Sequence, residues 1–419
     1  MAEVQDSILF GSHGRRALEV RGVVQRYAWG KVGVASRIAS MIGSCGEGQP
    51  LAEYWLGAHP KGPSTILGEG GLSVSLLDAI RDNSVSLLGA DVAARYSNEL
   101  PFLLKVLSIN PDFGLSIQAH PDEVRARALH ARDSLLYPDP RHKPEVALPL
   151  TRVTLLYGFR PLAEVQRVFG KFPELHELLN SELQAMLRAG GAAAPSEELA
   201  CIERLCRTLL TCSPAATAQV VQQLIERAHT EASESEELAL VARLARTYGE
   251  GDVGLVALFI MNLVKVDPGS ALFIGPNVPH AYLDGDLVEC MACSDNVVRA
   301  GLTSKPRDVE TLLEMLDYAP RSAQVIRPRV HDDGFLVVDT PASEFVVSFL
   351  PCGSGRQRLI SGPRVSMVLA LGQRLTMYHT SSGAQLVLSD GGAALIPPES
   401  GEYRLDRSDV AVYVVSPGE

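Results

Sequence analysis

The spacing of apolar residues changes twice along the chain. Short apolar runs separated by Gly- and Pro-rich turns, such as Ala17–Val24 and Pro101–Ser108, fill the first 155 residues and are typical of strands. From about Pro161, apolar residues recur at the three- and four-residue spacing of amphipathic helices. After Lys265 the short runs return. The pattern therefore predicts a β region, a helical block over residues 161–260 and a second β region.

Four segments carry the helical pattern inside this block. The first spans Glu174–Ala189 and the last spans Glu236–Tyr248. The second begins near Pro195, where Ser196 is the expected N-cap, and the third begins near Ser213. Because a strand-rich stretch resumes afterwards, the block is interpreted as an insertion into the first β domain.

The second β region begins with a turn at residues 266–270 and a buried strand at Ala271–Ile274. From about Ile326 onward, many short strands are expected at the spacing of a β-sandwich or small barrel. These are Phe335–Val338, Phe345–Phe349, Val365–Leu369, Arg374–Met377, Ala384–Leu388, Gly392–Ile396 and Val410–Val415.

The stretch Leu115–Asp122, reading LSIQAHPD, has the alternation of a strand with one polar face. Residues two apart in an extended chain point to the same side, so Ser116, Gln118 and His120 share a face. Pro121 cannot donate to a sheet ladder and should end the strand just after the histidine. A hydroxyl, an amide and an imidazole on one face are the beginning of a metal site or an active site.

Composition and charge narrow the class of protein. At 419 residues, two or three domains are expected, and 46% hydrophobic with 21% charged residues is ordinary for a globular enzyme. The net charge of −11 argues against a nucleic-acid partner or an anionic membrane surface. The first residues lack the apolar stretch of a targeting segment, and the longest apolar run, Val253–Met261, is too short to span a membrane.

The seven cysteines are scattered and fit a reduced, cytoplasmic protein. Cys290 and Cys293 form a lone CxxC without the second pair of a zinc ribbon, so we interpret them as buried, unreactive thiols. Cys45 is another member of this set.

Two further segments offer partners for Gln118 and His120. Glu145 follows His142-Lys143-Pro144 and leads into an apolar run, where a carboxylate is costly unless it is paired or binds metal. His280 follows the turn GPNVP. One amide, two imidazoles and one carboxylate suit a divalent cation, zinc first. Each residue alone is more often an ordinary polar side chain.

A run of charges among small and apolar residues follows at Glu289–Pro306, ECMACSDNVVRAGLTSKP. One interpretation is a solvated loop with a structural pair between Arg299 and Asp295. The other is that Arg299 and Lys305 meet an anion while Glu289 or Asp295 transfers protons. The residues alone leave both open.

With these segments the chain closely resembles type I phosphomannose isomerase. The sequence departs from the family pattern at Tyr54, where leucine is usual, and at Leu56, where methionine is usual. Both changes are expected to affect packing. The matching stretches are YAWG at 27–30, AEYWLGAHPKGPS at 52–64, LPFLLKVLSINPDFGLSIQAHPD at 100–122, HKPEVAL at 142–148, YGFRPLAEV at 157–165 and GPNVPHAYLDGDLVECMACSDNVVRAGLTSKPRDV at 275–309.

The resemblance implies a mainly β protein with two cupin-type jelly rolls and an α insertion. The implied limits are residues 1–160 and 261–320 for the catalytic jelly roll, 161–260 for the helical domain and 321–419 for the C-terminal jelly roll. It also implies one zinc ion per chain and the interconversion of mannose 6-phosphate and fructose 6-phosphate through an enediol. Such an enzyme supplies mannose for GDP-mannose and glycan synthesis, or feeds mannose into glycolysis. We expect a monomer whose partner is the sugar phosphate.

The resemblance also assigns residues. The implied catalytic arginine is Arg299, the implied residues near the sugar are His142 and Lys143, and the aspartate of the family's SDN triplet falls on Asp295. The implied zinc ligands are Gln118, His120, Glu145 and His280.

Our hypothesis adds roles to this set. Glu289 is the first choice for the proton shuttle between C1 and C2. Asp295, His142 and Lys143 are candidates for ring opening, and Ser116 and Lys305 for phosphate or sugar contacts. Trp29 either walls the pocket or is a structural residue.

Three alternatives remain open. A metal-assisted hydride shift could replace the proton shuttle. An iron(II) oxygenase would use two histidines and one carboxylate, but a fourth protein ligand argues against it. A non-catalytic sugar-phosphate sensor could keep the pocket, but the presence of Arg299 with the full ligand set argues against that.

Overall fold

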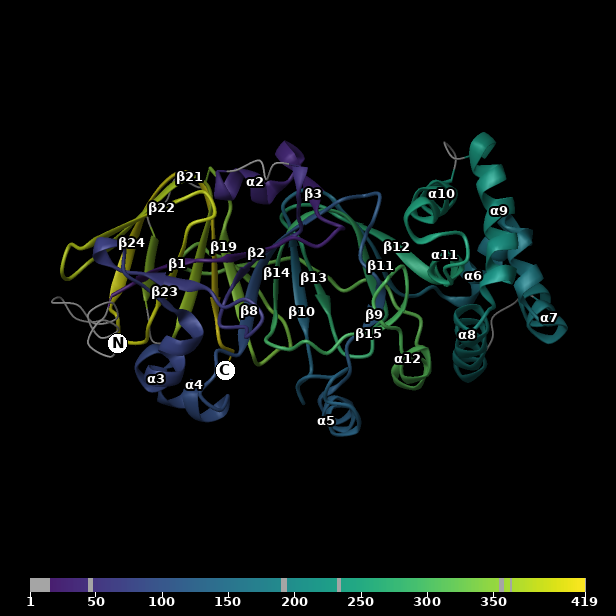
Figure 1. Cartoon of the computed structure of the whole chain (residues 1–419), viewed down its shortest axis with the longest axis horizontal. Coiled ribbons are helices and arrows are strands. Elements are labelled where there is room, and N and C mark those ends of the chain that lie inside the picture. The colour runs from purple at the N-terminus through teal and green to yellow at the C-terminus, as the bar shows by residue number, and fades with distance from the viewer. Residues whose placement is uncertain are drawn as a thin grey trace.

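The computed structural model describes residues 16–43, 48–189, 194–231, 235–353, 358–361 and 364–418. Three parts follow one another along the long axis of the molecule (Figure 1). A sheet made mostly of C-terminal strands lies at one end, a second sheet lies in the middle, and a group of helices lies at the other end. Cys45 lies outside the described residues. So do the first 15 residues, and the predicted absence of a targeting segment concerns those residues.

The middle sheet positions the site. Its eleven strands in the described chain follow the order β16-β13-β10-β14-β8-β5-β2, with β11, β12, β9 and β15 joined through β14. The bounds are β2 Val23–Gln25, β5 Glu53–Leu56, β8 Phe102–Ile109, β9 Ile117–Ala119, β10 Glu145–Pro149, β11 Val153–Phe159, β12 Met261–Val266, β13 Ala271–Ile274, β14 His280–Ala292, β15 Val298–Gly301 and β16 Val325–Ile326.

Strand β14 turns a corner in this sheet. Its first part pairs with β9 and β11, and its second part pairs with β8 and β10. Gly285 lies between the two parts with φ 116°, and a Cβ there would lie 2.8 Å from the carbonyl oxygen of Arg152. Only glycine fits this conformation and this close approach. One strand therefore supplies both His280 and Glu289 to the region enclosed by the sheet.

The other large sheet also has eleven described strands, in the order β17-β18-β19-β24-β21-β23-β1-β6-β7, with β20 on β24 and β22 on β21. Three N-terminal strands therefore extend a C-terminal sheet. The bounds are β1 Leu18–Arg21, β6 Thr65–Leu67, β7 Ser73–Ser75, β17 Arg329–Val330, β18 Leu336–Val338, β19 Val346–Leu350, β20 Arg358–Ser361, β21 Ser366–His379, β22 Gln385–Ser389, β23 Ala393–Ile396 and β24 Glu402–Ser416; β3 Lys31–Val32 and β4 Pro50–Leu51 pair separately.

Alternation along the strands of the middle sheet separates two faces. In β8, Leu104 and Val106 join an apolar cluster that also contains Met367 and Leu369 of the other sheet. Lys105 and Leu107, which alternate with these two residues, point to the opposite, inner face of the sheet. In β5, Tyr54 and Leu56 belong to the cluster between the sheets, while Trp55 packs with Leu103 and Met291. The two departures from the family pattern therefore face the packing between sheets.

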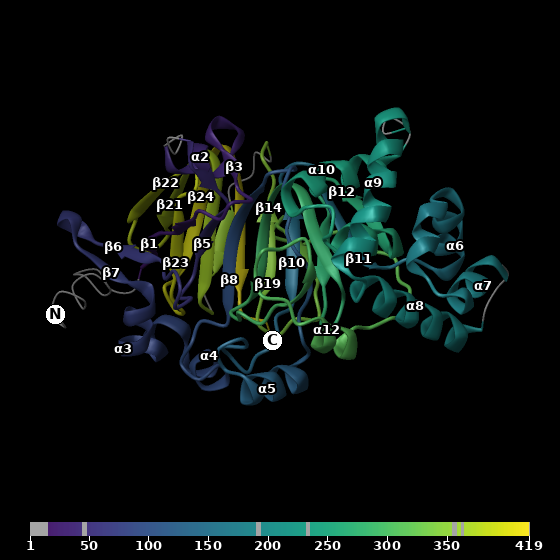
Figure 2. The ribbon, with the colours of Figure 1, turned by 45° about the vertical axis from the view of Figure 1, so that its right-hand side comes forward.

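The helices at the far end form one group (Figure 2). Their buried apolar residues form one cluster with residues of the adjoining strands. They are α6 Leu162–Lys171, η4 Pro173–Leu178, α7 Ser181–Ala189, α8 Pro195–Leu210, α9 Pro214–Glu231, α10 Glu236–Tyr248, α11 Gly254–Ala257 and η5 Leu258–Ile260. The remaining described helices are η1 Gly33–Ala35, α2 Arg37–Ile42, η3 Glu69–Gly71, α3 Leu76–Leu88, α4 Ala90–Arg95, α5 Glu123–Arg132 and α12 Val309–Met315.

The predicted mainly β fold with a helical insertion is confirmed. The single helix over Glu174–Ala189 was wrong, because Asn180 accepts a hydrogen bond from the Leu183 backbone N–H and starts α7 anew. Ser196 is not the N-cap of α8. Pro195 is the first helical residue, a position where its missing N–H costs nothing.

The strands predicted at 365–369 and 374–377 form one strand, β21. The glycine between them, Gly372, has φ 137° and approaches Asp409 too closely for a side chain, so it marks close backbone contact rather than a turn. The exact domain limits stay predictions. None of the helices in the described ranges is both long and apolar enough to cross a membrane. The six described cysteines are all free thiols.

Candidate metal centre and active-site cavity

A cavity of about 610 Å³ opens on the inner face of the middle sheet. His120 and His280 are fully buried beside it, and His142 does not line it. Nine predicted site residues line the cavity: Trp29, Ser116, Gln118, Lys143, Glu145, Glu289, Asp295, Arg299 and Lys305.

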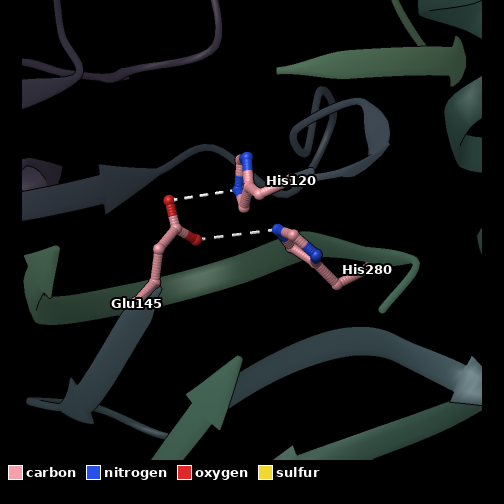
Figure 3. Close-up of side chains that lie close together, drawn as sticks. All are labelled: His120, Glu145 and His280. Carbon is pink, nitrogen blue, oxygen red and sulfur yellow. Dashed lines mark ion pairs between the residues drawn. The ribbon is translucent and has the colours of Figure 1, made fainter. Parts of the chain in front are cut away.

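Three predicted ligands meet at one end of this cavity, and each lies at or next to the end of a different strand (Figure 3). His120 follows β9, Glu145 begins β10 and His280 begins β14. One ligand atom from each lies within 4.8 Å of the others. The Nε2 atom of His120 is 3.3 Å from Oε1 of Glu145, and Nε2 of His280 is 3.6 Å from Oε2. Gln118, 8% exposed, is the cross-strand neighbour of His280.

The hydrogen bonds of the two histidines fix their tautomers. Nδ1 of His120 lies 2.8 Å from the Asn296 carbonyl oxygen, and Nδ1 of His280 lies 3.0 Å from that of Val278. A carbonyl only accepts, so both Nδ1 atoms carry the proton and both Nε2 atoms keep a lone pair when the ring is neutral. Burial lowers the pKa of both imidazoles, that of His280 to about 4.

These lone pairs converge on a charged carboxylate. Burial alone would raise the pKa of Glu145, but the charge of Lys143 outweighs it and holds that pKa well below its ordinary value. The Nζ atom of Lys143 is 2.9 Å from Oε1 of Glu145. Both Nε2 atoms are buried without a hydrogen-bond partner among the described residues. Lone pairs that face an anion in a dry site repel it, and a cation between them removes this repulsion, so the donor set fits a divalent metal.

A buried ion cluster that the sequence analysis missed lies next to this centre. Lys105 Nζ lies 3.3 Å from Oε2 of Glu289 and 3.7 Å from Oε2 of Glu53, and Glu53 also accepts from the indole N–H of Trp55. Burial would lower the pKa of Lys105, but Glu53 and Glu289 outweigh it and raise it. The signal was a single lysine on the inner face of an apolar strand, FLLKVLSI.

Glu289 itself is suited to gaining and losing a proton. Burial and the charge of Glu145 raise its pKa to about 7, against the opposing effect of Lys105. A carboxyl group with a pKa near 7 exchanges protons readily at neutral pH. The structure thus gives the predicted proton shuttle a suitable environment.

Cationic side chains occupy another part of the wall. Arg299 is the cross-strand neighbour of Gln118, and among the described residues its guanidinium donates only to the Val297 carbonyl oxygen, at 3.4 Å. Within the described chain, no carboxylate forms an ion pair with it by the usual distance criterion. Lys305 lies over the ring of Tyr27, 4.9 Å from its centroid. The two charges remain available to an anion.

Asp295 does not pair with Arg299, so the structural Arg–Asp pair considered above is absent from the described residues. Its carboxylate instead lies 3.4 Å from His59 Nε2 and 2.8 Å from Lys61 Nζ. Burial would raise the pKa of Asp295, but these two partners hold it well below the ordinary value. Asp295 is therefore an ionised carboxylate on the cavity wall.

His142 points away from the cavity chemistry. Its Nε2 lies 2.6 Å from Oε1 of Glu344, which belongs to the segment before β19 of the other sheet. Glu344 raises the pKa of this imidazole although burial opposes it. Trp29 lines the cavity and also packs on the apolar cluster below it, which fits both of its predicted roles.

Comparisons with known proteins identify relatives over nearly the whole chain. Residues 18–162 match the family "Phosphomannose isomerase type I, catalytic domain". Mannose-6-phosphate isomerase of Homo sapiens is 37% identical, covering 91% of this chain and 93% of that protein. Mannose-6-phosphate isomerase 2 of Arabidopsis thaliana is 38% identical, covering 95% and 92%.

Solved structures agree with this. A mutant of phosphomannose isomerase from Salmonella typhimurium superposes with a TM-score of 0.84 at 27% identity, covering 96% of this chain and 100% of that one. A mannose 6-phosphate isomerase bound with zinc and yttrium superposes with a TM-score of 0.83, at the same identity and coverage.

Proposed function

The chain belongs to the type I phosphomannose isomerase family, whose reaction interconverts mannose 6-phosphate and fructose 6-phosphate, and we propose that it uses zinc to do so. The proposed ligands are Gln118, His120, Glu145 and His280. The observation that carries this proposal is the pair of unpartnered Nε2 atoms aimed at the Glu145 carboxylate. A similar structure of a family member bound with zinc supports the choice of metal.

A bound divalent cation would polarise the oxygens at the C1–C2 end of the open-chain sugar. Glu289 then moves the proton between C1 and C2, because it lines the cavity beside the ligand set and has a pKa near 7. Lys105, held between Glu53 and Glu289, keeps the Glu289 carboxylate in one position. The intermediate of this route is an enediol.

The cationic side chains of the cavity wall meet the negative charges of the substrate and of its intermediate. Arg299 is placed beside Gln118, so we assign it to the developing charge of the enediolate. Lys305 and Ser116 line the cavity and are assigned to phosphate or sugar contacts. Ring opening falls to Lys143 and Asp295, since His142 does not line the cavity. The product would serve mannose activation or glycolysis.

The pH dependence of kcat/KM should report Glu289. The base must be ionised to accept a proton, so activity should rise with pH through an apparent pKa of about 7 and be lost below it. A cation bound to Glu145 cancels part of the negative charge that raises the Glu289 pKa. The acid limb of the pH profile, where activity rises with pH, should therefore have its midpoint at or below about pH 7. Glu289→Gln should remove the limb and most of kcat. An unchanged acid limb in that variant would assign it to another group.

The proposed metal and route are tested with the purified protein and fructose 6-phosphate. Formation of mannose 6-phosphate, followed in a coupled assay, should stop with a chelator and return with zinc. In D₂O, deuterium should enter C1 or C2 of the product. Full activity in the metal-free protein would refute the metal proposal, and product without solvent deuterium would favour the hydride shift over Glu289.

A further inference from the structure

One hydroxyl in the cavity has no role so far. Tyr282, the second residue after His280 on β14, lines the cavity although its side chain is only 1% exposed. Its Oη atom has no hydrogen-bond partner among the described residues. Buried tyrosine hydroxyls normally find a partner, because an unmade hydrogen bond in a dry site is costly. An unpaired phenol on the wall of a substrate cavity is therefore a group prepared for a ligand.

The position of this ring is fixed by its surroundings. The Leu115 backbone N–H donates to the Tyr282 carbonyl oxygen at 2.6 Å, and Leu155 is its partner across β11. The imidazole of His280 meets the ring edge-on, with centroids 6.3 Å apart. Because His280 is a proposed metal ligand, the phenol lies next to the end of the cavity where C1 and C2 would react.

We propose that the Tyr282 hydroxyl donates a hydrogen bond to a reacting oxygen, O1 or O2, of the open-chain sugar. This inference rests on the proposed function and adds a neutral donor to the cation of Arg299 and the metal. A preorganised neutral donor stabilises charge that develops in the transition state and costs no reorganisation there. The bond strengthens as the carbonyl becomes an enediolate, so it acts on kcat more than on KM.

Tyr282→Phe removes only this donor. We expect kcat to fall by roughly 10- to 100-fold, somewhat less than for loss of a sole oxyanion donor, because the metal shares the oxygen. Zinc content and Tm should equal those of the wild type, since the hydroxyl makes no bond within the described protein. An enediolate analogue, a hydroxamate of the sugar phosphate, should lose affinity more than fructose 6-phosphate does.

Tyr248→Phe is the matched control. Tyr248 also lines the cavity, but its hydroxyl already donates to the Gly114 carbonyl oxygen at 3.3 Å. The kcat of the Tyr248→Phe variant should stay within about twofold of that of the wild type, as expected when the substituted residue makes no transition-state contact.

Three results would overturn the inference: an unchanged kcat in Tyr282→Phe, a change confined to KM, or a loss of zinc or Tm that accounts for the lower activity. An inactive or metal-independent wild type would instead refute the proposed function. The two failures are therefore distinguishable.

Discussion

Arg299→Ala should lower kcat by at least about 100-fold, the loss expected when a preorganised charge is removed from a dry site. Its guanidinium lines the cavity opposite Gln118 and forms no ion pair with a carboxylate of the described chain. Burial lowers the pKa of Arg299 although Asp295 opposes this, so an anionic substrate would favour the charged guanidinium. Steady-state kinetics on both sugar phosphates measure the effect.

Folding and metal binding should survive this substitution. Within the described part of the chain, the Arg299 side chain donates only to the nearby Val297 carbonyl oxygen, so its loss leaves no distant group there unpaired. Arg299→Lys keeps the charge but loses the planar fork, and we expect it to recover only part of kcat. Near-normal turnover by the alanine variant, with full zinc content, would remove Arg299 from the mechanism.

The three residues that converge, His120, Glu145 and His280, could be singled out in the sequence because each lies at or next to the end of a recognisable strand. Alternation predicted Gln118 and His120 on one face of a strand ending just after the histidine, whereas β9 ends at Ala119, one residue before it. Glu145 and His280 each begin a strand next to Pro-containing turns. Their convergence was not predictable by spacing, since it depends on β14 crossing between β9, β11 and β10 at the Gly285 corner.

Residues whose role depends on contacts between distant segments could not be placed from the sequence. Lys105 lies in an apolar strand and becomes informative only when β8 pairs with β14 and places it opposite Glu289. In the sequence, Tyr282 is indistinguishable from an ordinary core residue, and only the cavity beside it indicates another role. His142 was expected near the sugar, but Glu344, about 200 residues later, holds it outside the cavity lining.

The arrangement of the two large sheets also could not be read from the chain. The first strand, β1, pairs with β23 through Leu18 and Leu395, so the N-terminal segment completes a sheet formed mainly by the last hundred residues. Nothing in the local pattern of a four-residue strand specifies so distant a partner. The shared apolar cluster between the sheets in turn fixes the outer face of β8 and β5, and thereby the inner face that carries Lys105 and Trp55.

His280→Ala should abolish tight zinc binding. The substitution removes one of two buried Nε2 lone pairs that face Glu145. Loss of an outer partner of a ligand already lowers metal affinity by about 10–100-fold, so loss of a ligand itself should exceed that. Isomerase activity should fall with zinc content and recover only in part at high zinc. Zinc competition with a chromophoric chelator measures affinity independently of turnover.

The matched control for this substitution is His130→Ala. His130 belongs to α5, and its Nδ1 contacts the Tyr137 carbonyl oxygen at 2.7 Å, away from the cavity lining. This variant should keep stoichiometric zinc and full activity, which separates the loss of a ligand from the loss of any histidine. If His280→Ala also retained stoichiometric zinc and full activity, the four-ligand centre would be wrong, and the converging lone pairs would need another partner, such as a proton shared with Glu145.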